Sequence, residues 1–230
     1  MSAAVPVVHR VPLGVDCCYL LVADDGRAVL VDAGWARQAG RFARRLRAIG
    51  VDPSQIGLIL ITHCHWDHVG SARAIRDLTG AKVAVHAAER DRLERGVVPM
   101  PPGVTPWGRA FRPFVQAMSL LYPVSPCPVD ITVEDRGLDL TPFGLAGRAL
   151  HTPGHSPGSL TVLLDDGRAF VGDLAMSGPP VRLHPGLPMF AEQPERLAAS
   201  WLLLLGAGAR TVHPAHGPAF PAEVLRPAVA

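Results

Sequence analysis

The chain has 230 residues, 48% of them hydrophobic, which is enough to bury a full core as a single domain. Its formal net charge is +2 and its basic residues are dispersed, which argues against a nucleic-acid partner. No apolar run is long enough to span a bilayer, and the first residues lack the pattern of a secretion signal. The four cysteines form no C-x-x-C pair. We therefore expect one cytoplasmic domain over residues 1–230, without a membrane partner.

Short apolar runs alternate with amphipathic segments along the chain, which predicts a mixed α/β protein. In the first half, the pattern predicts strands over 7–11, 17–23, 28–31, 56–61 and 82–86, and helices over 36–49, 67–78 and 87–95. In the second half, it predicts strands over 149–151, 160–164, 169–171 and 210–212, and a helix over 194–205.

Residues 96–127 form an unusual segment that is rich in proline and apolar side chains. Phe111, Phe114, Met118 and Leu121 recur there at helical spacing. Such a stripe either packs into a core, forms a contact in a homodimer, or faces a ligand as part of a lid insertion. Our working interpretation is a lid in which Phe111, Phe114 and Met118 contact the apolar part of a substrate.

A second proline-rich loop, residues 175–192, carries His184. His184 is a candidate substrate contact, and the alternative is an ordinary histidine on a surface loop.

The strongest chemical signal is a cluster of polar residues directly after the predicted strand 56–61. His63, His65, Asp67 and His68 lie within six residues of one another. Extended backbone places His63 and His65 on one side, where they can bind one ion, and the following turn lets Asp67 and His68 reach a second. A helix cap would explain Asp67 alone, but it leaves three neighbouring imidazoles without a partner. Cys64 points away from its neighbours and is interpreted as a packed residue rather than a ligand.

This H-x-H-x-D-H pattern resembles the signature of the metallo-β-lactamase superfamily, and shorter motifs at 31–34, 152–158, 172–174 and 214–217 follow in the family's order. The resemblance extends over nearly the whole chain and implies a four-layer αββα sandwich. It assigns one metal ion to His63, His65 and His155. It assigns a second ion to Asp67, His68 and His216, and it places Asp173 as a bridge between the two.

Nitrogen and oxygen ligands without a thiolate suit two Zn²⁺ ions, although iron and manganese accept the same set. Zinc lowers the pKa of bound water to about 7, which would supply a nucleophile for an acyl carbonyl. Asp67 and Asp173 are therefore the expected catalytic carboxylates. Asp32 and His151 are expected to orient the metal-binding histidines. On local sequence alone, Asp32 could equally be a turn residue, and His151 could equally serve packing.

Asp173 also bears on the subtype. Within the family, a bridging aspartate is typical of glyoxalase II and of lactonases, whereas authentic β-lactamases generally lack it. Ser159 stands where many of those enzymes have a second histidine, which weakens the transfer of either activity, and the short segment after His216 predicts no C-terminal glutathione-binding region. The expected function is metal-dependent hydrolysis of an ester, thioester or lactone in a small molecule with an apolar portion. Alternatives are an iron-dependent persulfide dioxygenase, a β-lactam or phosphodiester hydrolase, and a non-catalytic binding module.

Overall fold

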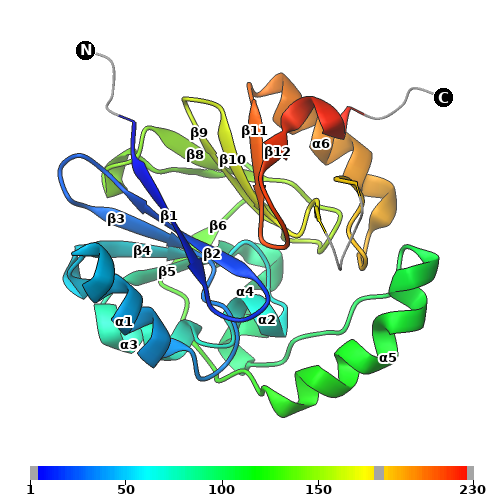
Figure 1. Cartoon of the computed structure of the whole chain (residues 1–230), viewed down its shortest axis with the longest axis horizontal. Helices are drawn as coiled ribbons and strands as arrows, with labels where there is room; N and C mark the ends of the chain where they lie inside the picture. Colours follow the sequence, from blue (N-terminus) through cyan, green and yellow to red (C-terminus); the bar gives the residue numbers. More distant parts are fainter. Residues whose placement is uncertain (1–4, 179–183, 227–230) are drawn as a thin grey trace.

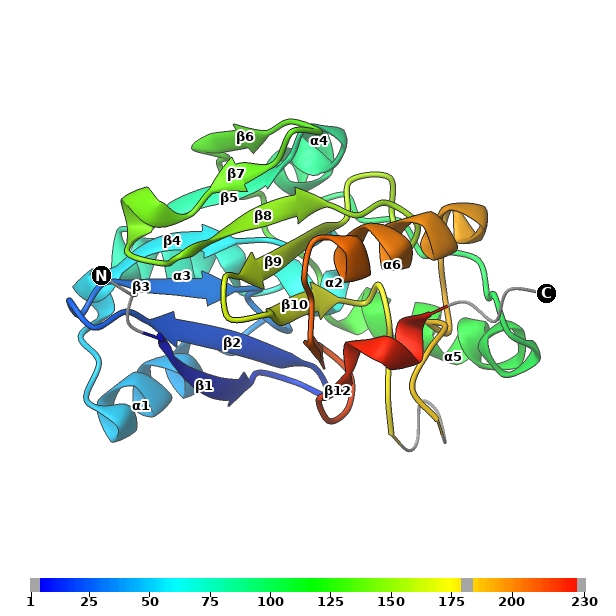
Figure 2. The same cartoon turned by 90° about the horizontal axis from the view of Figure 1, so that it is seen from above.

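The computed structural model describes residues 5–178 and 184–226. Two six-stranded sheets lie face to face, with helices against their outer faces (Figures 1 and 2). The first sheet has the order β1 (Val7–Pro12), β2 (Cys17–Val22), β3 (Ala28–Val31), β4 (Ile56–Leu60), β5 (Lys82–His86) and β6 (Ile131–Val133). The second has the order β12 (Phe220–Pro221), β11 (Thr211–Pro214), β10 (Arg168–Gly172), β9 (Leu160–Leu164), β8 (Gly147–His151) and β7 (Leu138–Asp139). This arrangement confirms the predicted α/β sandwich.

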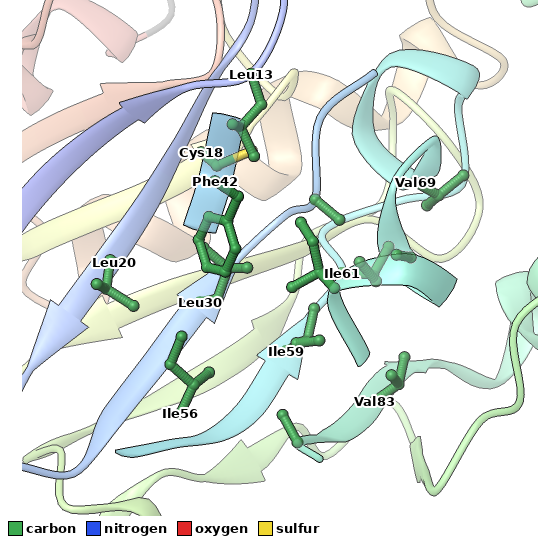
Figure 3. Packing of buried hydrophobic residues seen from close by; sticks show 14 of the residues in the cluster. Leu13, Cys18, Leu20, Leu30, Phe42, Ile56, Ile59, Ile61, Val69 and Val83 are labelled. Carbon is green, nitrogen blue, oxygen red and sulfur yellow. The ribbon is translucent and has the colours of Figure 1, made fainter. Parts of the chain in front are cut away.

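Three buried clusters hold the four layers together. The first lies between the first sheet and the helices α1 (Ala39–Ile49) and α3 (Ala72–Thr79); Figure 3 shows Phe42 of α1 next to Leu30 of β3. The second fills the space between the two sheets. The third joins the second sheet to α6 (Leu197–Gly206), where Trp201 and Leu204 are buried. Removing these apolar surfaces from water is the main stabilising contribution to the sandwich.

The strand directions place the carboxyl ends of strands from both sheets at one edge of the sandwich. Strands β3, β4, β5 and β6 run parallel in the first sheet, and β10 and β11 run parallel in the second. Their carboxyl ends are followed by the segments that carry most of the polar motifs, including Asp32, Asp173 and His216. Ligand sites in α/β proteins commonly form at such an edge because loops from several strands converge there.

The predicted helix over 67–78 is two helices, α2 (Trp66–Val69) and α3. The interruption falls at Gly70, where a Cβ atom would lie 2.2 Å from the backbone nitrogen of Ala36. A side chain at position 70 would therefore push Gly70 away from the backbone at Ala36. The prediction missed β6, β7 and β12, which have only two or three residues each and are too short for a periodic pattern to register.

Segment 96–127 follows α4 (Ala87–Arg95) and contains α5 (Pro106–Leu121), which extends along the edge of the molecule away from the sheets (Figure 1). Of its 16 residues only Gly108 is buried. Phe111 packs against a small buried cluster of Met176, Met189 and Phe190, whereas Phe114 and Leu121 are exposed. The stripe thus belongs to a core only at Phe111, and its role as a homodimer contact stays a prediction. No helix in the described ranges combines the length and apolar character that crossing a bilayer requires.

Candidate metal centre

Two groups of metal-binding side chains lie side by side at the sheet edge. The first group comprises His63, His65 and His155, and the second comprises Asp67, His68, Asp173 and His216. Side chains more than 90 residues apart in sequence meet here, because His155 follows β8 and His63 follows β4. The structure therefore brings together all the residues that the family resemblance suggested as ligands.

The three rings of the first group point their nitrogens at one another. The Nε2 atom of His155 lies 3.0 Å from Nε2 of His63 and 2.9 Å from Nδ1 of His65. The Nδ1 atom of His155 lies 2.8 Å from the carbonyl oxygen of Phe190, which can only accept, so this Nδ1 donates and Nε2 carries a lone pair. Converging lone pairs repel unless a cation lies among them. This donor set fits a divalent transition metal.

Burial keeps the rings of His63 and His155 neutral. It lowers the pKa of His63 well below its usual value, and nearby imidazoles add to the effect. Burial likewise lowers the pKa of His155 to about 3, assisted by His65. Metal ligands must be unprotonated, so these two rings are ready to bind an ion at neutral pH.

Asp173 lies between the two groups. Its Oδ1 atom is 3.3 Å from Nε2 of His68 and 3.4 Å from Nε2 of His216. Its Oδ2 atom faces the other way, 3.8 Å from Nε2 of His155. Among the described residues, Nε2 of His68 and Oδ1 of Asp173 are buried without a hydrogen-bond partner. Buried polar atoms without partners are costly, and an ion in contact with both would satisfy them.

The second group carries more charge than the first. Burial opposes protonation of His216, but Asp173 and Asp67 outweigh it and raise the pKa of His216 to about 9. Burial also opposes ionisation of Asp173, but His216 and His68 outweigh it and hold the pKa of Asp173 well below its usual value. Asp173 and Asp32 likewise outweigh burial and raise the pKa of His68 well above its usual value. At neutral pH, an ion entering the second group must therefore displace protons from His68 and His216.

Asp32 supports the second group from behind. Its Oδ2 atom lies 2.9 Å from Nδ1 of His68, and its Oδ1 atom accepts the backbone N–H of Thr62 at 2.8 Å. Asp32 has a φ of 63°, which is unusual for a residue other than glycine. A carboxylate on Nδ1 fixes the orientation and tautomer of His68, so that Nε2 points to the group.

His151 does not touch any of these side chains among its described contacts, which corrects the expectation that it orients a metal-binding histidine. Its ring stacks on His86 at a centroid distance of 3.9 Å, with Nδ1 3.2 Å from Asp135. The Nε2 atom donates to the carbonyl oxygen of Pro157 at 2.9 Å. His151 therefore anchors the loop that carries His155, and it belongs to a third histidine–carboxylate group, in which Asp135 is 85% exposed.

A cavity of about 350 Å³ opens beside both groups. The predicted substrate contacts Phe111, Phe114 and Met118 line it, whereas Leu121 does not. His184 is exposed and is not a lining residue, which corrects its assignment as a substrate contact. Apolar lining residues that the sequence did not indicate include Trp35, Trp66, Met100, Met176, Met189 and Phe190. They come from separate loops and helices, so no local pattern links them.

Comparisons with known proteins agree with this geometry. The family model of the metallo-beta-lactamase superfamily matches residues 14–216. The chain is 28% identical over 199 residues to a hydroxyacylglutathione hydrolase of Acidiphilium cryptum; the match covers 83% of this chain but 65% of that enzyme. It is 27% identical over 201 residues to the probable metallo-hydrolase YflN of Bacillus subtilis, covering 82% of this chain and 75% of that protein.

Two solved structures share the fold. BLEG-1, a B3 metallo-beta-lactamase, superposes with a TM-score of 0.70 at 24% identity and 95% coverage of both chains. TTHA1623 in a di-iron-bound form superposes with a TM-score of 0.64 at 25% identity and 96% coverage of both chains. The family match, the relatives and the buried histidine and aspartate groups together make this chain a metal-dependent hydrolase of the metallo-β-lactamase superfamily.

Proposed function

We propose that the chain is a dinuclear hydrolase of esters, thioesters or lactones that have an apolar acyl or ring portion. The observation that carries the two-ion part is Asp173, whose two oxygens face different groups. His63, His65 and His155 would hold one ion, and Asp67, His68 and His216 the other. Zinc suits these ligands, and the di-iron-bound neighbour makes iron the second candidate.

When bound, two such ions supply a water that ionises near neutral pH and polarise an acyl carbonyl. The protein's own part is to position these reactants and to handle the proton. Asp67 lies at the cavity wall, with Oδ2 3.4 Å from Nε2 of His216, where it can orient the water and accept its proton. Asp173 lies between the two groups and would contact both ions.

A serine nucleophile does not fit the site. Ser156 and Ser159 are buried, with their hydroxyl oxygens 3.0 Å apart, and neither is a lining residue of the cavity. Neither hydroxyl is therefore presented to a substrate, and neither has a general base beside it in its described hydrogen bonds. This supports hydrolysis by an activated water.

The composition of the cavity wall supports a substrate with an apolar portion. All four methionines after Met1 line it, together with aromatic side chains from α5 and α2. Methionine and aromatic side chains adapt to apolar ligands of varied shape. No lysine or arginine is found among the described lining residues, so the carboxylates of an acylglutathione would meet no basic partner there. An uncharged acyl chain or ring suits this wall better.

The test is a substrate panel assayed on zinc- and iron-loaded protein. It compares neutral aryl esters and lactones of increasing chain length with an acylglutathione, a β-lactam and a phosphodiester. We expect the highest kcat/KM for a neutral ester or lactone with an apolar chain, and loss of that activity on metal removal. Hydrolysis confined to the β-lactam or phosphodiester, or persulfide oxidation by the iron form alone, would overturn the proposal.

A further inference from the structure

We propose that Glu192 is a positioning residue that fixes the ring of His65 and thereby sets the affinity of the first metal site, with Arg92 as its anchor. This inference rests on the proposed metal centre. No motif in the sequence indicated Glu192, which lies at the end of a loop just before α6.

The ring of His65 has two different sides. Its Nδ1 atom faces the other two histidines of the first group, 2.9 Å from Nε2 of His155. Its Nε2 atom is buried, makes no described hydrogen bond, and lies 3.5 Å from Oε1 of Glu192. A neutral histidine that binds a metal through Nδ1 keeps its proton on Nε2. That N–H would point at the Glu192 carboxylate, which is an arrangement that fixes ligand orientation and raises ligand basicity.

Arg92 holds Glu192 in place. Its Nη1 and Nη2 atoms donate to Oε1 and Oε2 of Glu192, each at 2.8 Å. A two-pronged contact of this kind fixes the plane of the carboxylate as well as its position. Arg92 is itself braced by Glu89, whose Oε2 lies 3.2 Å from Nη1. The carboxylate is therefore preorganised by α4 and does not depend on the metal for its orientation.

Glu89 connects the same anchor to the two loops that carry the first group. This residue is fully buried, and its carboxylate accepts the backbone N–H groups of Cys64 and Gly158, each at 3.2 Å. Cys64 stands between His63 and His65, and Gly158 lies in the loop after His155. The helix α4 thus fixes both loops through Glu89 and the ring of His65 through Arg92 and Glu192.

The backbone around Glu192 supports His155 as well. The N–H of Glu192 donates to the carbonyl oxygen of His155 at 2.9 Å, and the carbonyl oxygen of Phe190 accepts from Nδ1 of His155 at 2.8 Å. Residues 190–192 therefore contact two of the three histidines in the first group. His68 in the second group is oriented separately, by Asp32. Loss of the Glu192 side chain should weaken the first site and spare the second.

The experiment measures stepwise zinc binding to full-length protein by competition with a chromophoric chelator. Glu192→Ala should raise the dissociation constant of the first site about 10- to 100-fold, the usual effect of removing a carboxylate behind a metal-binding histidine, and leave the second nearly unchanged. Glu192→Gln keeps an oxygen that can accept a hydrogen bond from Nε2 of His65. Its dissociation constant at the first site should lie between those of the wild type and Glu192→Ala. Glu195→Ala, three residues along the chain at an exposed position, is the matched control and should match the wild type.

Nuclear magnetic resonance of the imidazole nitrogens adds a readout that general destabilisation would not produce. In zinc-loaded wild-type protein, the Nε2 proton of His65 should be protected from exchange with water, and in Glu192→Ala it should exchange faster while the signals of His68 stay in place. If Glu192→Ala does not fold, Arg92→Lys tests the same idea, because it removes the two-pronged contact and should weaken the first site by a smaller factor.

The outcomes separate this inference from the proposed function. Wild-type protein that binds less than one zinc ion would overturn the metal centre itself. Wild-type protein that binds two ions, with the same first-site affinity in Glu192→Ala, or in Arg92→Lys where only that variant folds, would overturn the role of Glu192 alone. Equal weakening of both sites by Glu192→Ala would also overturn it, because that result indicates a general structural role.

Discussion

The two walls of the cavity differ in how firmly their side chains are held. On the metal-binding wall, most side chains are buried and follow the end of a strand. Two of the histidines are also held by an acceptor on their other ring nitrogen, His68 by the carboxylate of Asp32 and His155 by the carbonyl group of Phe190. On the facing wall, α5 buries only Gly108, and Phe114 is 57% exposed although it lines the cavity. The first wall needs fixed geometry for chemistry. The second wall can change its exposed side chains, such as Phe114, without disturbing the core, which suits the selection of substrates.

The largest effect is expected on the metal-binding wall. Asp173→Asn keeps the size of the side chain but removes the charge that faces both groups. We expect kcat/KM to fall on the order of 10³-fold, the scale seen when a group that stabilises developing charge is lost. Metal content should fall below two ions per chain. Elemental analysis and steady-state kinetics check this, and a variant that keeps both ions and most of its activity would contradict the bridging role.

Asp32→Asn tests the second group as Glu192→Ala tests the first. The amide tolerates the left-handed backbone at position 32 but cannot act as an anionic acceptor for Nδ1 of His68. We expect the second zinc ion to bind about 10- to 100-fold more weakly, with the first nearly unaffected. The same chelator competition measures it. A loss at the first site instead would show that the two groups are not held independently.

The difference in charge between the groups predicts different pH dependence. His216 has a raised pKa of about 9, so it is protonated at neutral pH in the metal-free protein and must lose that proton to bind an ion. Asp173 and Asp32 outweigh burial and raise the pKa of His68 as well, so filling the second site also displaces a proton from His68. Zinc affinity at the second site should therefore rise at least about tenfold per pH unit between pH 7 and 8.5. The first site should change little over that range, because the pKa of His155 is about 3. Calorimetric titrations in buffers of different ionisation enthalpy would count the released protons; none released on filling the second site would contradict this prediction.

The smallest effect is expected on the α5 wall. Phe114→Ala should lower kcat/KM for long-chain esters relative to short ones by about 1 kcal/mol, or roughly fivefold, because it removes part of an apolar contact. Stability should change by less than about 0.5 kcal/mol, since the side chain is exposed. Leu120→Ala, at a residue that is 79% exposed and does not line the cavity, is the control. An unchanged chain-length preference in Phe114→Ala would remove α5 from the substrate site.

The same contrast explains what the sequence could predict. His63, His65, Asp67 and His68 lie within one short motif, so their spacing alone indicates a metal site, and strand β4 before them has a clear apolar pattern. The more distant ligands could be assigned only by family resemblance, because the chain returns to the site through β8, β10 and β11.

Other features depend on packing that no local pattern records. Met100, Met176 and Met189 meet only because three loops converge at the cavity, and Glu192 faces His65 only because Arg92 reaches it from α4. His184 and His151 show the reverse case. A histidine near a motif in sequence need not face the site in space: His184 does not line the cavity, and the ring of His151 contacts Pro157 instead of a ligand.

Anomalous X-ray diffraction from crystals of zinc-loaded protein, recorded at the zinc absorption edge, tests the central claim most directly. We predict two peaks in each molecule, one among His63, His65 and His155 and the other among Asp67, His68 and His216, both in contact with Asp173. A single peak in fully loaded crystals, or two peaks of which one lies away from Asp173, would contradict it.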